Sequence, residues 1–546
     1  MIKSKIVTSL EKVFLKDDID RLKEIKKIHA LKGERISYQI VLASDKYQRY
    51  DLKYKINSKF ENIKINRVGF VPSECPVFEK RLDDYYITTK PGLFPDVLYP
   101  LKANDLITIY EYTNTTLWFT IDIPNKIDAG DYSVEIELYN SEIREKLTLN
   151  IKIEDIILPS SDLIYTDWLH TDCIASYYNV EVFSDKYWQL VEMFMKTAVR
   201  TGVNTILTPI ITPPIDTEVG GERPTVQLVD IEYKSGKYLF NFNNLEKWIK
   251  IALKSGIKYF EMAHLFTQWG TEATPKIVVT EDGKLIKKFG WHVKSNDPKY
   301  AEFLNQFLPA LVNKLEKLNL KQKVFFHISD EPSSERETDF TNYMYAKKLV
   351  SKHLKGYKII DALSNIDFYK KGLIENPIPA TDVIEPFLAE NIKERWCYYC
   401  CGQTQDVSNR FMAMPSYRNR ILGTQLYLYD ITVFLHWGFN FYYSSLSRER
   451  INPFMTTDAK QAFPSGDAFC VYPGENEVYE SIRSVVFYEG LQDRMLLKLL
   501  ENKIGKEETK KFVNNMFNLT ITFKEYPHEK EFFDYLKDKI IEKINM

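Results

Sequence analysis

The feature that most constrains the fold is the alternation of helix-like and strand-like segments that begins after "LPSSD". Apolar runs such as "VNTILTP", "IKYFEMAHLF" and "KVFFHISDEP" have strand character, and segments with helical spacing precede them. In the first of these helical segments, Trp188, Val191 and Met195 recur between Ser184, a possible N-cap, and Gly202, a possible stop. About eight such units follow one another, which predicts a (β/α)8 TIM barrel.

The part of the chain before "LPSSD" has a different pattern. Segments such as "ERISYQIVLAS", "LWFTIDIP" and "GDYSVEIELYN" alternate apolar and polar residues between turn signals, which is typical of an antiparallel β-sandwich. We therefore expect a β-sandwich domain over residues 1–157, a barrel over 158–505 and a C-terminal helical extension over 506–546. The segment "VQLVDIEYKSGKYLFNF" predicts a hairpin inserted in the early barrel loops.

Composition excludes several classes of function. The chain of 546 residues has 73 Lys and Arg against 75 Asp and Glu, a formal net charge of −2, so nucleic acid is not an expected partner. Its beginning lacks the pattern of a signal peptide, and no stretch approaches the roughly 20 apolar residues of a membrane span. With only six cysteines, a disulfide framework is not expected, and a cytoplasmic location without a membrane partner is the prediction.

The most unusual local feature is "FFHISDEPSSE", in which a strand-like run ends in Asp330 and Glu331, followed by Pro332. Active sites of (β/α)8 barrels lie at the carboxyl ends of the strands, so these acids are the first candidates for catalysis. A residue before proline favours extended backbone, which we expect to present Glu331 at the rim. The alternative is a solvated turn with a helix cap.

Other strand ends supply aromatic, amide and ionisable side chains. Together they favour a carbohydrate pocket, since aromatic faces stack on sugar rings and no glycine-rich phosphate loop is present. The candidates are Trp168, His170, Asp172, His264, Trp269, Glu385, Tyr398, Tyr399, Gln403, Trp437, Asn440 and Tyr443. Structural roles for the histidines, for Trp437 and for the nearby loop residue Asp467 remain open.

No metal or cofactor is expected. The segment "CYYCC" has one zinc-like spacing without a second pair of ligands, and residues three apart on a strand point to opposite faces. The predicted pocket is therefore one of carboxylates and aromatic rings.

Several motifs together resemble the catalytic domain of glycoside hydrolase family 123, also catalogued as domain of unknown function 4091. They are "WLHTDC", "HISDEP", "HWGFNFYY", "GDAFCVYPG" and "SIRSVVFYEGLQD". The resemblance implies an exo-acting β-N-acetylgalactosaminidase in which Asp330 orients the 2-acetamido group of the sugar and Glu331 is the general acid/base. "GDAFCVYPG" departs from the family pattern by its alanine and phenylalanine.

The adjacency of the two acids also bears on mechanism. A conventional retaining glycosidase places two carboxyls about 5–5.5 Å apart on opposite sides of the scissile bond, which neighbours on one strand end do not easily do. Substrate assistance by the 2-acetamido group needs only one acid and one orienting carboxylate, and we expect ionised Asp330 to raise the pKa of Glu331. Two alternatives stay open: a conventional retaining enzyme that uses Glu331 and Glu385, and a catalytically silent carbohydrate-binding protein.

Overall fold

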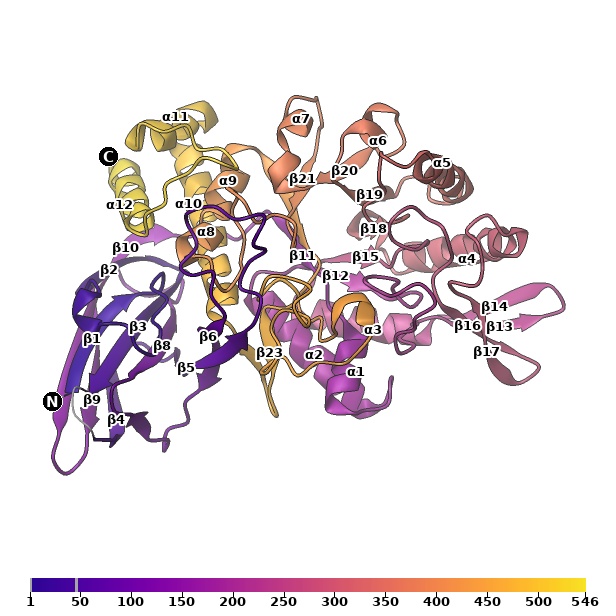
Figure 1. Cartoon of the computed structure of the whole chain (residues 1–546). Coiled ribbons are helices and arrows are strands. Elements are labelled where there is room, and N and C mark those ends of the chain that lie inside the picture. Colours follow the sequence, from indigo (N-terminus) through magenta and orange to yellow (C-terminus); the bar gives the residue numbers. More distant parts are fainter. Residues whose placement is uncertain (1, 45–47) are drawn as a thin grey trace.

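The computed structural model describes residues 2–44 and 48–546 (Figure 1). A β-rich N-terminal region lies beside a barrel, and the last helices lie next to the N-terminal region. Among the described residues, no helix combines the length and apolarity that crossing a bilayer requires.

The N-terminal region consists of two five-stranded sheets. The first has the order β1 (Ile2–Thr8), β3 (Arg35–Ser44), β8 (Asn114–Asp122), β5 (Ile63–Ser73), β6 (Gly92–Pro100), and the second has the order β2 (Lys27–Lys32), β10 (Arg144–Ile157), β9 (Gly130–Tyr139), β4 (Tyr50–Ser58), β7 (Ile107–Ile109). All neighbouring pairs are antiparallel except β2 and β10. Alternate residues of both sheets, such as Phe119 and Ile136, share one buried apolar core, as the period-two pattern predicts.

The second region contains an eight-stranded parallel sheet that is nearly closed. Its order is β20 (Asn376–Pro379), β19 (Lys358–Leu363), β18 (Val324–Phe326), β15 (Tyr259–Met262), β12 (Thr205–Thr208), β11 (Ile164–Asp167), β22 (Ile431–His436), β21 (Arg395–Tyr398). A parallel bridge between Ala380 and Tyr398 joins the two outer strands. Side chains such as Leu207, Phe325 and Val433 fill the interior, so the barrel is a packed core.

Helices connect the barrel strands, some of them short. They are α1 (Thr171–Tyr178), α2 (Asp185–Arg200), α3 (Asn243–Ser255), α4 (Pro298–Lys317), α5 (Glu337–Ser351), α6 (Asp367–Lys370), α7 (Glu385–Leu388), α8 (Ser416–Arg420), α9 (Leu422–Leu428) and α10 (Ile482–Ile504). The Ser184 hydroxyl caps α2 as expected, by accepting from the Tyr187 N–H at 3.3 Å. Glu385, predicted to lie at a strand end, does not follow a strand: the segment "DVIEPFL" around it folds as a short 3-10 turn and α7, and "NPIP" supplies the sixth strand.

Two further elements decorate the barrel. The predicted hairpin forms as β13 (Asp230–Lys234) and β14 (Lys237–Asn241), and β16 (Ile277–Glu281) and β17 (Lys284–Phe289) extend it to a four-stranded sheet. A short pair, β23 (Val471–Pro473) and β24 (Val478–Glu480), follows the last barrel strand.

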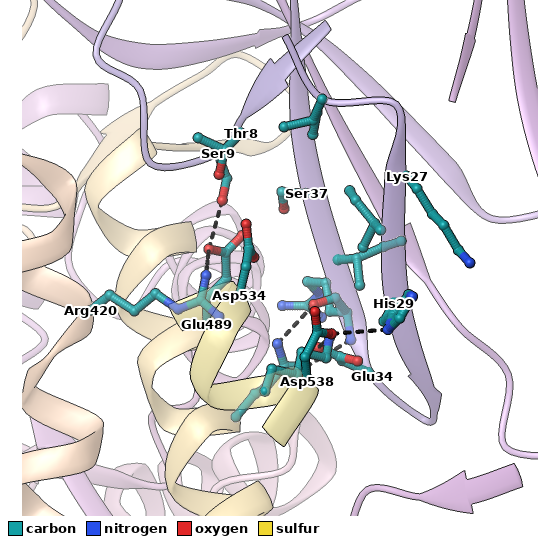
Figure 2. Close-up of a pocket in the computed structure, with 16 residues that line it drawn as sticks. Thr8, Ser9, Lys27, His29, Glu34, Ser37, Arg420, Glu489, Asp534 and Asp538 are labelled. Atoms are coloured by element: carbon teal, nitrogen blue, oxygen red, sulfur yellow. Dashed lines mark hydrogen bonds and ion pairs between the residues drawn. The ribbon is translucent and has the colours of Figure 1, made fainter. Parts of the chain in front are cut away.

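The C-terminal segment folds as α11 (Lys506–Met516) and α12 (Glu531–Asn545), and α12 packs on the sandwich. Figure 2 shows the polar cavity at this junction, where residues of β1 and β2 meet α8, α10 and α12. Its charges are largely paired within the cavity: Lys537 with Glu34, and His29 with Asp538 at 2.9 Å. The cavity is therefore part of the joint between the two regions.

The sandwich is also joined to the barrel by a buried ion pair. Arg483 at the start of α10 donates two hydrogen bonds of 2.9 Å to Asp96 of β6, and both side chains are about 1% exposed. Tyr472 donates a further bond of 2.6 Å to the same carboxylate. Removal of one partner leaves the other charge buried and uncompensated.

We therefore expect Asp96→Ala to destabilise the protein by about 3–5 kcal/mol, because Arg483 loses its counter-charge. The measurement is the urea midpoint of unfolding. Glu222→Ala is the matched control, since Glu222 pairs with Lys276 and Lys287 at the surface, where such a pair is worth at most about 1 kcal/mol. Equal shifts for the two variants would contradict a stabilising role for the buried pair.

Candidate active site

Asp330 and Glu331 lie just beyond β18, at the carboxyl end of the fourth barrel strand. The backbone that leads to them is fixed by Asp361, whose carboxylate accepts the N–H groups of Ile328 and Ser329 at 3.1 and 3.3 Å. The Trp269 N–H donates to the backbone carbonyl of Asp330 at 2.9 Å, which ties the acid loop to the loop after β15. The position of the pair is thus set by backbone contacts from two neighbouring strands.

A buried charge cluster lies directly beneath the pair. The imidazole of His327 contacts Glu261 through Nε2 and Asp361 through Nδ1, the latter at 3.1 Å. Burial alone would lower the pKa of His327, but these carboxylates raise it to about 10. His327 is therefore an imidazolium at neutral pH, and it precedes Asp330 by three residues in the chain.

The two acids open into one pocket with aromatic walls. The residues that line it are Trp168, Ile215, Asp216, Gln268, Trp269, Asp330, Glu331, Ala362, Tyr398, Cys400, Cys401, Leu435, Trp437 and Phe463. In the order of the eight strands, β22 lies four positions from β18, so Trp437, just after β22, faces the acids across the mouth. Trp437 packs edge-on against Phe463 with ring centroids 5.4 Å apart, and Trp269 is 40% exposed at the rim.

Glu331 has a strained backbone. Its φ is +41°, in the left-handed region, and not the extended conformation expected before proline. Such a conformation costs a non-glycine residue about 1–3 kcal/mol and persists only where surrounding contacts impose it. Here the Tyr398 hydroxyl donates to the Glu331 carboxylate from the far side of β19 and β20. The strain aims the carboxylate into the pocket.

Both carboxyl groups of the pair have pKa values above the usual range of Asp and Glu side chains. Burial raises the pKa of Asp330 well above its ordinary value, and the charge of Glu331 adds to the rise. Burial also raises the pKa of Glu331, but the hydrogen bond from Tyr398 opposes that rise. The prediction from the sequence is that ionised Asp330 raises the pKa of Glu331. In the structure the larger rise is that of Asp330, because the Tyr398 hydrogen bond favours the carboxylate form of Glu331.

A third carboxyl, Asp216, lines the pocket on the loop after β12. Its Oδ2 accepts the Leu446 N–H at 2.8 Å, and its own N–H donates to Gln268 Oε1 at 2.6 Å. Burial raises the pKa of Asp216 to about 6. Asp216 is not among the residues predicted from the sequence, because the proline-rich segment "TPPID" has no strand pattern, although Asp216 follows a barrel strand as the other pocket residues do.

The structure brings some of the sequence-predicted residues together and leaves others apart. Asp330, Glu331, Trp168, Trp269, Tyr398 and Trp437 line the pocket. The other predicted residues do not line the pocket: His170, Asp172, His264, Glu385, Tyr399, Gln403, Asn440 and Tyr443. Glu385 is exposed at the start of α7, and His264 stacks on His327 at 4.1 Å beneath the pocket floor.

Several of these other residues have structural partners instead. Asp172 forms a buried bidentate pair with Arg223 at 2.7 Å, and His170 contacts Arg223 through Nδ1 at 3.1 Å. The side-chain amide of Asn440 bonds both the N–H and the carbonyl of His170. These contacts fix the loop after β11, since each polar group has its partner inside the fold.

The remaining polar contacts of the site follow the same pattern. The Gln403 amide donates to Asp382 at 2.9 Å, and the Tyr443 hydroxyl bonds Ser176 at 3.0 Å. Asp467, one of the loop candidates, accepts the Trp437 indole N–H at 3.0 Å and so orients that ring. Asp467 therefore supports the pocket wall from behind.

One group of side chains in the described part of the chain has metal-like spacing. Atoms of His264, His327 and Asp361 lie within 4.8 Å of one another. Both nitrogens of His327 already contact carboxylates, so neither is free to bind a metal ion. His264 stacks on His327, and its two ring nitrogens have no hydrogen-bond partner among the described residues. We assign no metal to it.

The arrangement suits acid/base chemistry on a ring-shaped polar ligand. Two adjacent carboxyls, both with raised pKa values, lie at one end of the pocket, and indole and phenol rings form its walls. Asp216 supplies a further hydrogen-bond acceptor.

The chain is similar in fold and in sequence pattern to known proteins. Over the whole chain, the structure is similar to a family 123 glycoside hydrolase from Clostridium perfringens, with a TM-score of 0.75 at 16% identity, covering 100% of this chain and 98% of that one. A β-glucuronidase from Bacteroides uniformis matches 81% of this chain and 47% of its own, at 11% identity and a TM-score of 0.31. No curated protein sequence matches. The family model for the catalytic domain of glycoside hydrolase 123 matches residues 168–500, more than half of the chain and all of the pocket, and the chain therefore belongs to glycoside hydrolase family 123.

Proposed function

We propose that the protein is an exo-acting β-N-acetylgalactosaminidase-like enzyme that retains anomeric configuration through substrate assistance. The observation that carries this proposal is the position of Asp330 and Glu331, adjacent on one strand end in one pocket. Such a pair can serve one face of a glycosidic bond, which is what substrate assistance requires. The similar enzyme from Clostridium perfringens is described by its glycolipid glycan hydrolysis, which supports a glycan substrate.

In the first step, the acetamido oxygen of the substrate attacks the anomeric carbon. Glu331 gives its proton to the glycosidic oxygen, the bond from that oxygen to the anomeric carbon breaks, and the leaving group departs as an alcohol. Asp330 accepts the acetamido N–H and stabilises the positive charge of the cyclic oxazolinium. In the second step, the Glu331 carboxylate takes a proton from water, which attacks the same carbon and reopens the ring.

Substrate would also redistribute the proton of the pair. An acetamido N–H that donates to Asp330 favours the ionised form of that residue, and the negative charge of ionised Asp330 then favours the protonated form of Glu331. The Tyr398 hydroxyl then stabilises the Glu331 carboxylate that forms after proton transfer. His327 beneath the pair adds a positive charge that lowers the pKa of Asp330.

A conventional retaining mechanism through Glu385 has little support. Glu385 is exposed on α7 and outside the pocket lining, whereas a nucleophile must lie about 5–5.5 Å from the acid/base carboxyl. The silent binding protein is a distinct alternative, and turnover decides between the two.

We expect Glu331→Gln to abolish turnover of unactivated substrates and Asp330→Asn to reduce kcat by about 10²–10⁴-fold, since each removes a positioned acid, base or orienting charge. Glu385→Gln is the matched control and should leave kcat within a few-fold of the original. The measurement is steady-state hydrolysis of an aryl β-N-acetylgalactosaminide. Inactivity of Glu385→Gln with a covalent sugar on Glu385 in the original enzyme would favour the conventional mechanism.

Tyr398→Phe should move the alkaline limb of the kcat profile, which reports the enzyme–substrate complex, to higher pH. Glu331 acts first as an acid, so activity falls as pH rises through its pKa, and loss of the Tyr398 hydrogen bond raises that pKa. Tyr399→Phe is the control, because Tyr399 is buried outside the pocket lining. An unmoved limb in Tyr398→Phe would mean that Glu331 does not control it.

The enzyme should reject sugars that carry a 2-hydroxyl in place of the acetamido group. An internal nucleophile is worth up to about 7–11 kcal/mol, against about 1–3 kcal/mol for one lost pocket contact, so the difference should appear mainly in kcat. The measurement compares aryl β-N-acetylgalactosaminide with aryl β-galactoside, beside inhibition by a thiazoline copy of the cyclic intermediate. Equal rates without thiazoline inhibition would exclude substrate assistance.

A further inference from the structure

Asp216 and Gln268 form a polar pair in the pocket that the mechanism above does not use. They come from the loops after β12 and β15, and the loop after β22 holds Asp216 in place. The Ser447 hydroxyl donates to the Asp216 carbonyl at 2.6 Å, and the Leu446 N–H donates to its Oδ2. Asp216 has a φ of +40°, so three loops together impose a conformation that costs free energy.

The pair has one unused acceptor and one unused donor. Oδ2 of Asp216 is bonded to Leu446, which leaves Oδ1 on a residue that lines the pocket. Oε1 of Gln268 is bonded to the Asp216 N–H, whereas its buried Nε2 has no partner among the described residues. A buried amide donor without a partner costs about 1–3 kcal/mol, so a ligand group that accepts from it binds favourably.

Position around the barrel indicates which part of a sugar would reach the pair. β15 and β12 follow β18 in the sheet order, so Gln268 and Asp216 lie progressively farther around the rim from Asp330 and Glu331. An anomeric carbon placed at the acids leaves the opposite edge of the ring, C3 and C4, for these side chains. A neighbouring acceptor and donor match two neighbouring hydroxyls, one donating and one accepting.

We propose that Asp216 and Gln268 bind the vicinal C3 and C4 hydroxyls of the terminal sugar, and that this contact sets the preference for the configuration at C4. The inference rests on the proposed function, because it places the anomeric carbon at the acid pair. Burial raises the pKa of Asp216 to about 6, which leaves the residue mainly ionised at neutral pH and a strong acceptor for a hydroxyl.

Two conservative variants separate this role from a structural one. Asp216→Asn keeps an oxygen for the Leu446 N–H but removes the charge, and Gln268→Glu keeps an acceptor for the Asp216 N–H but removes the donor. Asp282→Asn, in the exposed turn between β16 and β17, is the matched control. Thermal unfolding checks that each variant is folded.

The readout is kcat/KM on an aryl β-N-acetylgalactosaminide, its 4-deoxy analogue and its C4 epimer. In the original enzyme and in Asp282→Asn, kcat/KM for the 4-deoxy sugar should be about 10–100-fold lower than for the parent substrate. This factor corresponds to the loss of one hydrogen bond to a charged group. In Asp216→Asn, kcat/KM for the parent substrate should fall by a similar factor. In this variant, kcat/KM for the 4-deoxy sugar and for the C4 epimer should differ from that of the parent substrate by no more than about threefold. A full deoxy penalty in both variants would overturn the proposal.

Failure of the proposed function gives a different result. If galactoside and N-acetylgalactosaminide react equally, substrate assistance fails, and the same deoxy comparison on the galactoside still tests Asp216. If no glycoside reacts, calorimetry with methyl β-N-acetylgalactosaminide and its 4-deoxy analogue replaces kinetics. Equal losses of affinity on removing the C4 hydroxyl and on replacing Asp216 with Asn would support the contact between Asp216 and that hydroxyl. Binding of neither sugar would overturn the inference.

Discussion

The geometry of the acid pair depends on one buried interaction, the contact of His327 with Glu261 and Asp361. The two carboxylates keep the imidazole protonated, and Asp361 also accepts the backbone N–H groups that lead to Asp330. The same carboxylate therefore fixes a charge and a backbone position. Glu261 extends the cluster to the indole N–H of Trp168 at 3.0 Å, so the pocket floor and the acids share one rigid base.

Above this base, three of the residues that line the pocket have a strained backbone. Asp216, Trp269 and Glu331 all have positive φ, at +40°, +58° and +41°, and each belongs to a different barrel loop. Non-glycine residues adopt such conformations only where other contacts impose them, and here hydrogen bonds between the loops do so. Packing of the barrel thus holds the pocket side chains in place before substrate arrives, which lowers the cost of ordering them on binding.

The sequence predicts the parts of this structure that depend on local pattern. Strand and helix alternation is a local signal, and it indicated the barrel and placed Asp330 and Glu331 at the fourth strand end. Contacts between distant segments leave no such signal: the pairing of Arg223 with Asp172 removes a predicted residue from the pocket, and Leu446 holds an unpredicted one, Asp216, within it. For the same reason the proline that follows Glu331 predicted the wrong backbone for that residue, whose φ is imposed by tertiary contacts.

The sandwich contributes to the site through a chain of buried contacts. Asp96 of the sandwich holds Arg483, and Arg483 donates to the carbonyl of Gly466 at 2.7 Å. Gly466 has a φ of +99°, and a Cβ there would lie 3.0 Å from the Arg483 guanidinium, so only glycine lets the loop approach this closely. The next residue, Asp467, accepts the indole N–H of Trp437, which faces the acids. The orientation of an aromatic wall in the barrel therefore depends on a charge in the sandwich, so contacts between the two regions help to shape the pocket.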